Sequence, residues 1–424
     1  MLTLRFIQEN QDLIIERLKI KNFDAKDILT QILELDKQRK FTQNGMDENK
    51  AALNKLSKEI GQLFKNGKVE EANQAKEKNG RLKEDIKKQA ESLNQIEKEL
   101  NHWLVQLPNI PHESVPPGKG EEDNLEVRTG GTMPELTPNA MPHWDLAKKY
   151  DLIDFELGNK ITGSGFPVYK GKGAKLQRAL INYFLDQAIA AGYHEVLPPL
   201  MVNEDSGFGT GQLPDKEGQM YHVTQDNLYL IPTAEVPVTN IFRDEILMAK
   251  DFPVRMTAYT PCFRREAGSY GKDVRGLNRL HQFDKVEIVQ FQHPEKSYAT
   301  LQEMLNHVEH LVQSLNLPYR ILKLCGGDLS FTSALTYDFE VYSVAQQKWL
   351  EVSSVSNFEA YQANRLKLRF KEEGEKKTKL AHTLNGSALA LPRILAALLE
   401  NNQTPEGILI PEVLQPYTGF AIID

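Results

Sequence analysis

The chain has 424 residues, more than a single hydrophobic core usually supports, so two or more domains are expected. Hydrophobic residues make up 40% and charged residues 26%, which excludes a wholly disordered chain. No run of about 18 apolar residues occurs, and the start MLTLRFIQEN lacks the pattern of a secretory signal, so a cytoplasmic protein without a membrane span is expected. The two cysteines, Cys262 and Cys325, lie far apart, which disfavours a disulfide framework or a cysteine metal site.

The formal net charge of −7 is unevenly distributed along the chain. Residues 1–104 hold 20 Lys and Arg against 18 Asp and Glu, which leaves 31 against 40 for the remainder. The positive excess lies between Lys37 and Lys88, with 14 basic and 8 acidic residues. This segment is suited to a polyanion, although a solvated packing or dimerisation hairpin is the alternative that the residues alone leave open.

The same segment carries a helical apolar period. Apolar residues follow alternating steps of four and three from Ile28 to Leu63, and again from Ala72 to Trp103 after the polar break KNGKVEEAN. Two helices with one apolar seam each predict an antiparallel coiled coil. We also expect local fraying or bends at Gly45, Gly61 and Gly80, because glycine costs about 1 kcal/mol relative to alanine in a helix.

After Trp103 the pattern changes. LPNIPHESVPPGKGEEDN contains four prolines and two glycines and is typical of a linker. Downstream come an amphipathic helix, GAKLQRALINYFLDQAIAAGY, a short strand interrupted by prolines, EVLPPLMV, and further strand candidates: NLYLIPTAEVPV, VRMTAYTPCFRREA, RLHQFDKVEIVQF, TYDFEVYSV and KWLEVSSVSNFEAY. Because strands follow one another without intervening helices, an α+β domain with an antiparallel sheet is predicted. No GxGxxG or Walker-type loop occurs, which disfavours the common nucleotide-binding folds.

The stretch FRREAGSYGKDVRGLNRLHQFDKVEIV concentrates arginine on a glycine-containing hairpin loop between two predicted strands. Because side chains alternate along a strand, Arg264 and Glu266 are expected to share one face. Arg279, Phe283 and Glu287 are expected to share a face of the partner strand. Two cations, an aromatic ring and two carboxylates on one surface would suit a zwitterion joined to phosphate and a base. A surface hairpin with cross-strand salt bridges is the alternative.

A second cationic feature lies near the C-terminus. LNGSALALPRILAALLEN predicts a strand that runs into an amphipathic helix, with Pro392 at the favoured first helical position. Arg393 then lies in the first turn, where a cation is unfavourable beside the positive end of the helix dipole. A bound anion would compensate, so the helix start and Arg393 together predict a phosphate site.

These segments resemble the motifs of the class II aminoacyl-tRNA synthetases. Phe263, Arg264 and Glu266 with the HQF strand resemble motif 2, and NGSALALPRILAALLE resembles motif 3. The GAKLQRALINYF helix with EVLPP resembles motif 1, where Pro199 matches a dimer-interface proline. The TAE of IPTAEVPVTN, EVSSVSNFEAYQANR and the helical arm resemble the seryl-tRNA synthetase family in particular, over essentially the whole chain.

The resemblance implies an α+β fold: a class II antiparallel β-sheet catalytic domain with helices, preceded by a coiled-coil arm. The expected limits are 1–104 for the arm, 105–130 for a linker and 131–424 for the catalytic domain. It implies a cytoplasmic homodimer that activates L-serine with ATP and Mg²⁺, and then transfers the seryl group to tRNA(Ser) and also to tRNA(Sec). DNA and membranes are not expected partners. The alternatives are a non-catalytic relative and a relative that loads a carrier protein.

The resemblance also implies site residues. Serine would be bound by Thr233, Ala234, Glu235, Arg264, Glu287, Asn385 and Ser387. ATP would be bound by Arg264, Arg265, Glu266, Leu280, Phe283, Glu351, Val352, Ser353, Ser354 and Arg393. The catalytic residues would be Arg264, Arg393 and Glu287. Mg²⁺ would be held by Glu351 and Ser354, and the tRNA acceptor end by Lys272 and Arg275.

Several of these residues have more specific implied roles. Arg264 would bind the α-phosphate and the serine carboxylate, and Arg393 the γ-phosphate. Glu287 would hold the ammonium group. Two residues depart from the family pattern, which usually has a small residue at the position of Arg265 and commonly glycine at that of Pro392. Arg265 could add a phosphate contact or point outward, and Pro392 should stiffen the helix start.

Overall fold

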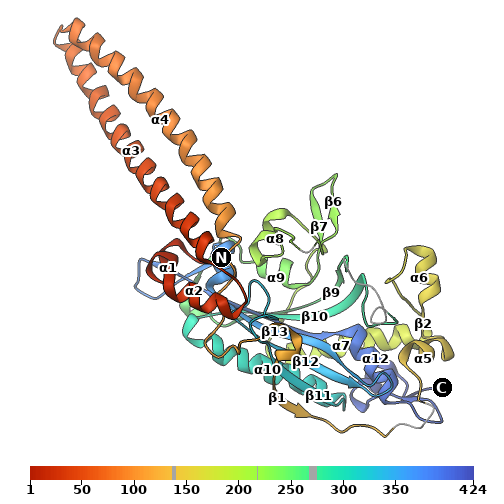
Figure 1. Ribbon diagram of the computed structural model, residues 1–424. Helices are drawn as coiled ribbons and strands as arrows, with labels where there is room; N and C mark the ends of the chain where they lie inside the picture. The colour runs from red at the N-terminus through yellow and green to blue at the C-terminus, as the bar shows by residue number, and fades with distance from the viewer. Residues whose placement is uncertain (136–139, 217, 267–274) are drawn as a thin grey trace. The chain divides into compact units, whose positions relative to one another are not determined.

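The computed structural model describes residues 1–135, 140–216, 218–266 and 275–424. They form two compact units: Met1–Lys19 with Phe23–Pro108, and Ile20–Asn22 with Asn109–Asp424 (Figure 1). In the described part of the chain, no helix combines the length and the apolar character needed to cross a membrane.

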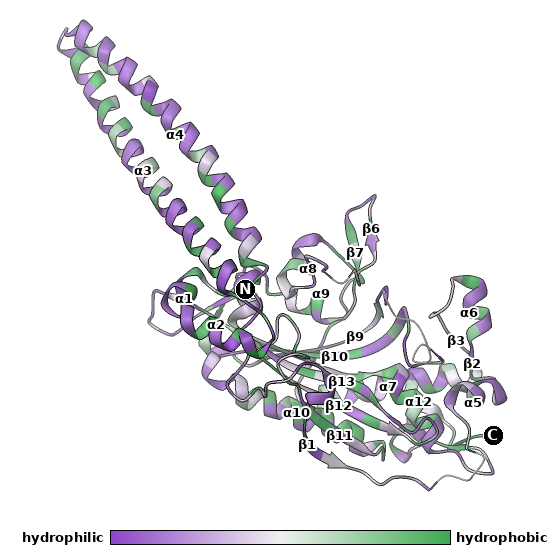
Figure 2. Ribbon diagram, in the orientation of Figure 1, coloured by the Kyte–Doolittle hydropathy of each residue, from purple (hydrophilic) through white to green (hydrophobic). Residues whose placement is uncertain are grey.

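The first unit is helical. It contains α1 (Leu4–Glu9), α2 (Gln11–Ile20), α3 (Lys26–Lys65) and α4 (Val69–Leu104), and the last two form the long hairpin in Figure 1. Mostly hydrophilic residues cover this hairpin, with hydrophobic residues recurring along it (Figure 2). Members of the predicted seam are buried along both helices: Ile32, Leu35, Met46, Ala72, Ala75, Leu93 and Leu100. The predicted antiparallel coiled coil is confirmed.

Polar residues within the seam are paired across the hairpin. Asn49 Nδ2 donates to Gln89 Oε1 over 3.0 Å, and Asn79 Nδ2 donates to Ser57 Oγ over 2.9 Å. The helices run without a break through Gly45, Gly61 and Gly80, so the predicted fraying is wrong, and the alternative of local bends stays a prediction. The physical reason is that packing along a long partner helix outweighs the modest propensity cost of single glycines.

An eight-stranded sheet forms the base of the second unit. Its order is β1 (Leu125–Gly130), β11 (Tyr319–Lys323), β12 (Leu335–Ser343), β13 (Lys348–Glu359), β16 (His382–Ala390), β10 (Gln282–Gln292), β9 (Val254–Phe263) and β4 (His194–Glu195). All neighbours are antiparallel except β4 and β9. The predicted α+β fold with an antiparallel sheet is therefore confirmed.

Helices surround this sheet. They are α5 (His143–Lys149), α6 (Phe155–Ile161), α7 (Gly171–Ala190), α8 (Glu204–Thr210), α9 (Glu235–Asn240), α10 (Ser297–Ser314), α11 (Ala360–Leu366), α12 (Leu391–Asn401) and α13 (Gln415–Thr418). Short strands complete the unit: β2 (Ile153–Asp154), β3 (Val168–Tyr169), β5 (Met201–Val202), β6 (His222–Val223), β7 (Leu228–Leu230), β8 (Ile246–Met248), β14 (Arg369–Lys371), β15 (Thr378–Leu380), β17 (Ile408–Leu409) and β18 (Ile422–Ile423).

Alternation along β10 separates the main core from a polar face. Val286 and Ile288 are fully buried in the core that α7, α10 and α12 complete. Phe283, Lys285 and Glu287 point to the other face, because successive side chains of a strand point in opposite directions. Here one face of the sheet therefore carries polar groups, and the other face packs against the core helices.

Two segments differ from the prediction. NLYLIPTAEVPV was expected to be strand throughout, but β7 ends at Leu230 and α9 begins at Glu235, so the second half of that prediction is wrong. The Glu235 N–H donates to Thr233 Oγ1 over 3.2 Å, and burial of Val236 and Val238 stabilises the helix against its β-branched composition. The segment expected to be a linker, 105–130, includes β1, which pairs with β11.

Candidate active site

The β9–β10 hairpin brings Arg264 and Phe283 together. Phe283 lies opposite Cys262, two residues before Arg264, so the two side chains share a face as predicted. The Arg264 guanidinium lies 5.1 Å from the centre of the Phe283 ring, and its Nε donates to the Pro232 carbonyl over 3.4 Å. The backbone N–H of Arg264 bonds the carbonyl of His281 over 2.9 Å. Arg264 is thus held beside the strand end with an aromatic ring next to it.

The predicted alternation does not extend to Glu266 and Arg279. β9 ends at Phe263, Glu266 has a φ of 49°, and Arg279 precedes the start of β10. The two side chains instead form an ion pair with each other. The prediction that strand geometry places them on the site face is therefore wrong, because the ladder stops before reaching them.

The loop residues predicted to meet nucleic acid can be placed only in part. Lys272 lies outside the described residues. The Arg275 guanidinium lies 4.7 Å from the Trp144 ring, in a cation–π contact. Arg265 is exposed, and its backbone N–H bonds the Gln219 carbonyl over 2.8 Å.

A buried cluster of charged and hydroxyl groups lies next to Arg264. Lys285 Nζ is 2.6 Å from Glu287 Oε2 and donates to Thr233 Oγ1 over 2.9 Å. Thr233 Oγ1 in turn donates to Glu287 Oε2 over 3.0 Å. Ser387 lies opposite Glu287 in the β10–β16 register, and Asn385 lies opposite Val289, so both share the face of Glu287. The sequence-predicted Thr233, Glu287, Asn385 and Ser387 are therefore brought together.

Glu235 lies behind this cluster as a buried carboxyl group. Its Oε1 accepts from Gln362 Nε2 over 2.7 Å, and Asn385 also bonds it. Thr383 Oγ1 donates to Gln362 Oε1 over 2.6 Å, which fixes the orientation of the Gln362 amide. Burial, and then the negative charge of Glu287, raise the pKa of Glu235 to about 7. Glu235 therefore changes charge near neutral pH.

Arg393 lies in the first turn of α12, so the predicted helix is confirmed. The helix begins at Leu391, which makes Pro392 its second residue and not its first as predicted. Its Nη1 donates to the Glu351 backbone carbonyl over 2.9 Å and lies 3.7 Å from Glu351 Oε2. Its Nε donates to the Asn278 carbonyl over 3.0 Å. Because these partners belong to β13 and to the segment before β10, Arg393 is connected to both neighbours of β16 in the sheet.

Oxygen atoms that could hold a divalent cation lie on β12 and β13. Ser354 lies opposite Asp338 and bonds its carboxyl group, whose Oδ1 is buried without a hydrogen-bond partner among the described residues. Burial, and then the nearby Glu351, raise the pKa of Asp338. No group of three or more His, Cys, Asp or Glu in the described part of the chain could hold a metal by itself. Glu351 and Ser354 nevertheless fit Mg²⁺, which is usually held by one or two protein oxygens plus phosphate oxygens.

Other predicted site residues have buried side chains and offer mainly backbone atoms. Ala234 is 0% exposed, Val352 1% and Leu280 5%. Ser353 is also buried and donates through Oγ to the Ser387 carbonyl over 2.5 Å. Residues of this kind can shape a pocket or contact a ligand through the main chain.

Lys285 and Gln362 were missed as site residues. Lys285 stands two residues before Glu287, so strand alternation could have placed it on the same face. For Gln362, which belongs to α11, the sequence offered no signal, because its contact with Glu235 joins segments that are far apart in the chain.

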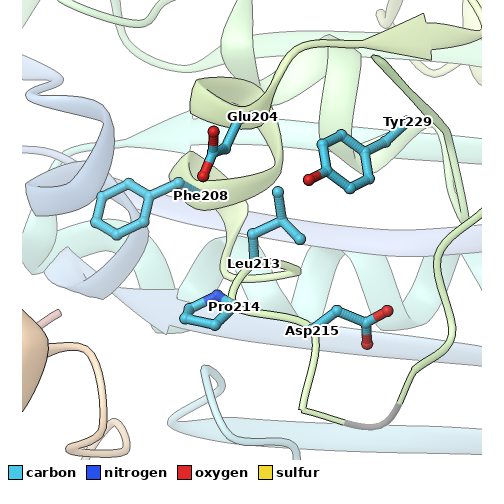
Figure 3. A pocket seen from close by; sticks show the side chains of 6 residues that line it. All are labelled: Glu204, Phe208, Leu213, Pro214, Asp215 and Tyr229. Carbon is cyan, nitrogen blue, oxygen red and sulfur yellow. The ribbon is translucent and has the colours of Figure 1, made fainter. Parts of the chain in front are cut away.

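A separate cavity of about 350 Å³ lies beside α8 and β7 (Figure 3). It is lined by Glu204, Phe208, Leu213, Pro214, Asp215 and Tyr229. None of these is a predicted site residue. The cavity is therefore distinct from the charged cluster on the sheet.

Comparison with known families gives matches in both units. Residues 1–111 match the family model of the seryl-tRNA synthetase N-terminal domain. Residues 221–402 match that of the tRNA synthetase class II core domain (G, H, P, S and T). A serine–tRNA ligase from Salinibacter ruber is 52% identical over 424 residues, which cover 100% of this chain and 99% of the relative.

Solved structures show the same likeness. The crystal structure of seryl-tRNA synthetase from Pyrococcus horikoshii complexed with ATP has a TM-score of 0.92 at 34% identity, and the match covers 100% of this chain and 99% of that one. Cytoplasmic serine–tRNA ligase from Naegleria fowleri in complex with AMP has a TM-score of 0.87 at 28% identity, with the same coverage.

Proposed function

Since the chain belongs to the seryl-tRNA synthetase family and is a serine–tRNA ligase, we propose that it activates serine on the sheet face where Arg264, Glu287 and Arg393 are found. The observation that carries this proposal is the arrangement on β9, β10, β16 and β13. These four strands are neighbours in the sheet. Arg264 lies beside the Phe283 ring at the β9–β10 hairpin, and the buried Glu287 cluster lies on β10. Arg393 follows β16 and lies near Glu351 of β13.

Adenylate formation fits these groups. The serine carboxylate attacks the α-phosphate of ATP, and pyrophosphate leaves, so the catalyst must mainly hold two anions close together and stabilise charge on phosphate oxygens. Arg264 would bind the α-phosphate and the carboxylate, because a guanidinium can donate two parallel hydrogen bonds. Arg393 would exchange its contact with the Glu351 carboxylate for the γ-phosphate. Phe283 would stack on adenine, with the Leu280 backbone and Glu266 at its polar edge and Arg265 as a further phosphate contact.

The serine side of the site would be formed by the buried cluster. Glu287 would hold the ammonium group, and Thr233, Glu235, Asn385 and Ser387 would surround it and the hydroxyl, with the Ala234 backbone between them. A buried site that bonds a hydroxyl rejects an analogue without one, because its own polar groups would be left unpaired. Alanine should therefore be excluded by chemistry and threonine by size.

Glu351 and Ser354 would hold Mg²⁺, with the backbone of Val352 and Ser353 between them. The ion would supply positive charge for the phosphate oxygens of ATP when bound. Arg275 and Lys272 would contact phosphates of the tRNA acceptor end. The relative complexed with ATP supports nucleotide binding at this fold.

The basic arm would bind the long variable arm of tRNA(Ser), and tRNA(Sec) would be a second substrate. We assign the arm to 1–104 and the catalytic domain to 131–424, and count β1, at the end of the segment 105–130 that was expected to be a linker, with the catalytic domain because it pairs with β11. The site of action would be the cytoplasm, where charged tRNA is consumed.

Charging of unfractionated tRNA with labelled serine tests the overall reaction, and failure to charge any tRNA would refute it.

A pH dependence of serine binding is expected from Glu235. Below its pKa of about 7 the carboxyl group is protonated, so its attraction for the serine ammonium is lost as pH falls. The KM for serine should therefore rise about tenfold between roughly pH 8 and pH 6. The measurement is ATP–pyrophosphate exchange at saturating ATP. Glu235→Gln is the control and should show a flat profile, whereas a flat profile in the unaltered protein would contradict this role.

A homodimer is expected to form through the edge of the sheet near β4. Leu197 follows this edge strand with 86% of its surface exposed, and Ile189, Leu200 and Met201 are also exposed hydrophobic residues in this region. Leu197→Glu should shift the protein from dimer to monomer in analytical ultracentrifugation, because a charge would be buried in an apolar contact. Leu409→Glu is the matched control, since Leu409 is 50% exposed elsewhere. A dimer unaffected by Leu197→Glu would argue against this interface.

A further inference from the structure

Three side chains hold the short segment Gly276–Asn278, which leads toward β10. His143 Nε2 accepts from the Leu277 N–H over 2.8 Å. Gln346 Oε1 accepts from Asn278 Nδ2 over 2.9 Å, and the Asn278 carbonyl accepts from Arg393 Nε over 3.0 Å. The segment thus connects the start of α5 directly to the arginine proposed to bind the γ-phosphate of ATP.

His143 is paired with Glu400 in the interior, where both side chains are 0% exposed. His143 Nδ1 lies 2.7 Å from Glu400 Oε1. The same carboxylate accepts from the His143 backbone N–H and from Gln346 Nε2, each over 2.8 Å, and from Ser343 Oγ. These four donors satisfy the buried Glu400 carboxylate, and none of them belongs to a lysine or arginine side chain.

The two partners of His143 define its tautomer. Glu400 can only accept at Nδ1, so the proton is on Nδ1. The Leu277 N–H can only donate, so Nε2 must carry a lone pair. The imidazole is neutral. Because Glu400 holds the ring in place, Nε2 is a fixed acceptor for the backbone N–H of Leu277.

The backbone beside the ring is built for close approach. Gly276 has a φ of 66°, and a Cβ at this position would lie 2.2 Å from His143 Nε2. A side chain would therefore clash with the ring as well as strain the backbone. Only glycine lets the chain pass over His143 at hydrogen-bonding distance.

Glu400 and Arg393 belong to the same helix and are seven residues apart, which is close to two turns, so both lie on one side of α12. Arg393 contacts the Asn278 carbonyl, and Glu400 reaches the Asn278 side chain through Gln346. Asn278 is therefore connected to α12 at two points. An arrangement of this kind fixes the direction of the Arg393 guanidinium relative to the sheet.

We infer that His143 and Glu400 form a positioning pair for the ATP site, which holds Leu277 and Asn278 so that the Asn278 carbonyl orients Arg393. The inference rests on the proposed role of Arg393 at the γ-phosphate. His143 touches no substrate in this scheme. Its loss would leave Arg393 held by Glu351 without a fixed Asn278 carbonyl. ATP would then bind less well while serine binding would persist.

Two substitutions separate the functions of the ring. His143→Gln places an amide oxygen near the position of Nε2 and retains an acceptor for Leu277, whereas His143→Asn retains only a donor toward Glu400. KM values for ATP and for serine are measured by ATP–pyrophosphate exchange, with melting temperatures recorded for each variant. His143→Asn should raise the KM for ATP on the order of tenfold with little change for serine, and His143→Gln should largely restore it. Tyr183→Phe is the matched control, because it removes a 2.7 Å hydrogen bond from the buried Tyr183 to Ser314, away from the ATP site.

Specific results would overturn the inference. Unchanged KM for ATP in both His143 variants would do so, as would equal increases in both KM values, which indicate general structural damage. No rescue by His143→Gln in a folded variant would also count against it. Absence of serine-dependent exchange in the unaltered protein would instead refute the proposed function, so the two failures are distinguishable.

Discussion

Replacing Arg393 with alanine is expected to lower serine-dependent ATP–pyrophosphate exchange by about 10² to 10³-fold while the protein stays folded. The reason is that the Arg393 cation at the start of α12 would stabilise the γ-phosphate charge, and an alanine side chain offers no replacement. Its present partners are the Glu351 and Asn278 carbonyls, which are backbone acceptors that water can replace, and the Glu351 carboxylate at 3.7 Å. The loss should therefore concern catalysis and not stability.

Arg255→Ala is the matched control. Its side chain is 32% exposed, as is that of Arg393, and it also forms an ion pair, with Glu303 at 3.0 Å. Surface pairs of this kind contribute little to stability, so this variant should exchange pyrophosphate at the unaltered rate. Normal exchange in Arg393→Ala would refute the assigned role of Arg393.

Shortening the arm is expected to separate the two half-reactions. Gly45 and Gln89 face each other on α3 and α4, and a Cβ at Gly45 would lie 3.2 Å from the Gln89 amide. A short Gly–Ser linker can therefore join these positions in place of residues 46–88, which removes 11 basic and 8 acidic residues. The shortened arm keeps Arg39 and Lys40, which neutralise the buried Asp36. Arg39 Nη2 lies 2.7 Å from Asp36 Oδ1, and Lys40 Nζ lies 2.8 Å from Asp36 Oδ2.

The shortened protein should form seryl-adenylate at the unaltered rate, since every proposed residue for that step lies in the other unit. Charging of tRNA should fall roughly a hundredfold or more, because the phosphate contacts of the arm are lost. Charging by the full chain should weaken steeply with added salt, and charging by the shortened chain should be less sensitive. Equal loss of both activities would contradict a separate role for the arm.

The sequence alone predicted the local patterns well. The apolar seam of the α3–α4 hairpin and the strand-to-helix junction at Pro392 follow from periods that a single segment carries. Alternation likewise placed Phe283 and Glu287 on one face, and the register confirms it. Side-chain alternation holds only within the paired strands. Glu266 and Arg279 lie outside β9 and β10 and pair with each other, so the predicted face was wrong for both.

Contacts between distant segments could not be predicted in this way. Gln362 orients Glu235, and His143 is paired with Glu400, across 127 and 257 positions of the chain. No local period relates such residues, because folding alone brings them together. The helix at Glu235 illustrates a further limit, since burial of its valines overrides their preference for strands.

The measurement that tests the central claim most directly is ATP–pyrophosphate exchange by the full chain with each of the twenty amino acids in turn. A site that combines the Glu287 cluster with Arg264 and Arg393 should support exchange with serine and give background rates with alanine and threonine. Exchange that is absent with serine, or equally fast with another amino acid, would contradict the account.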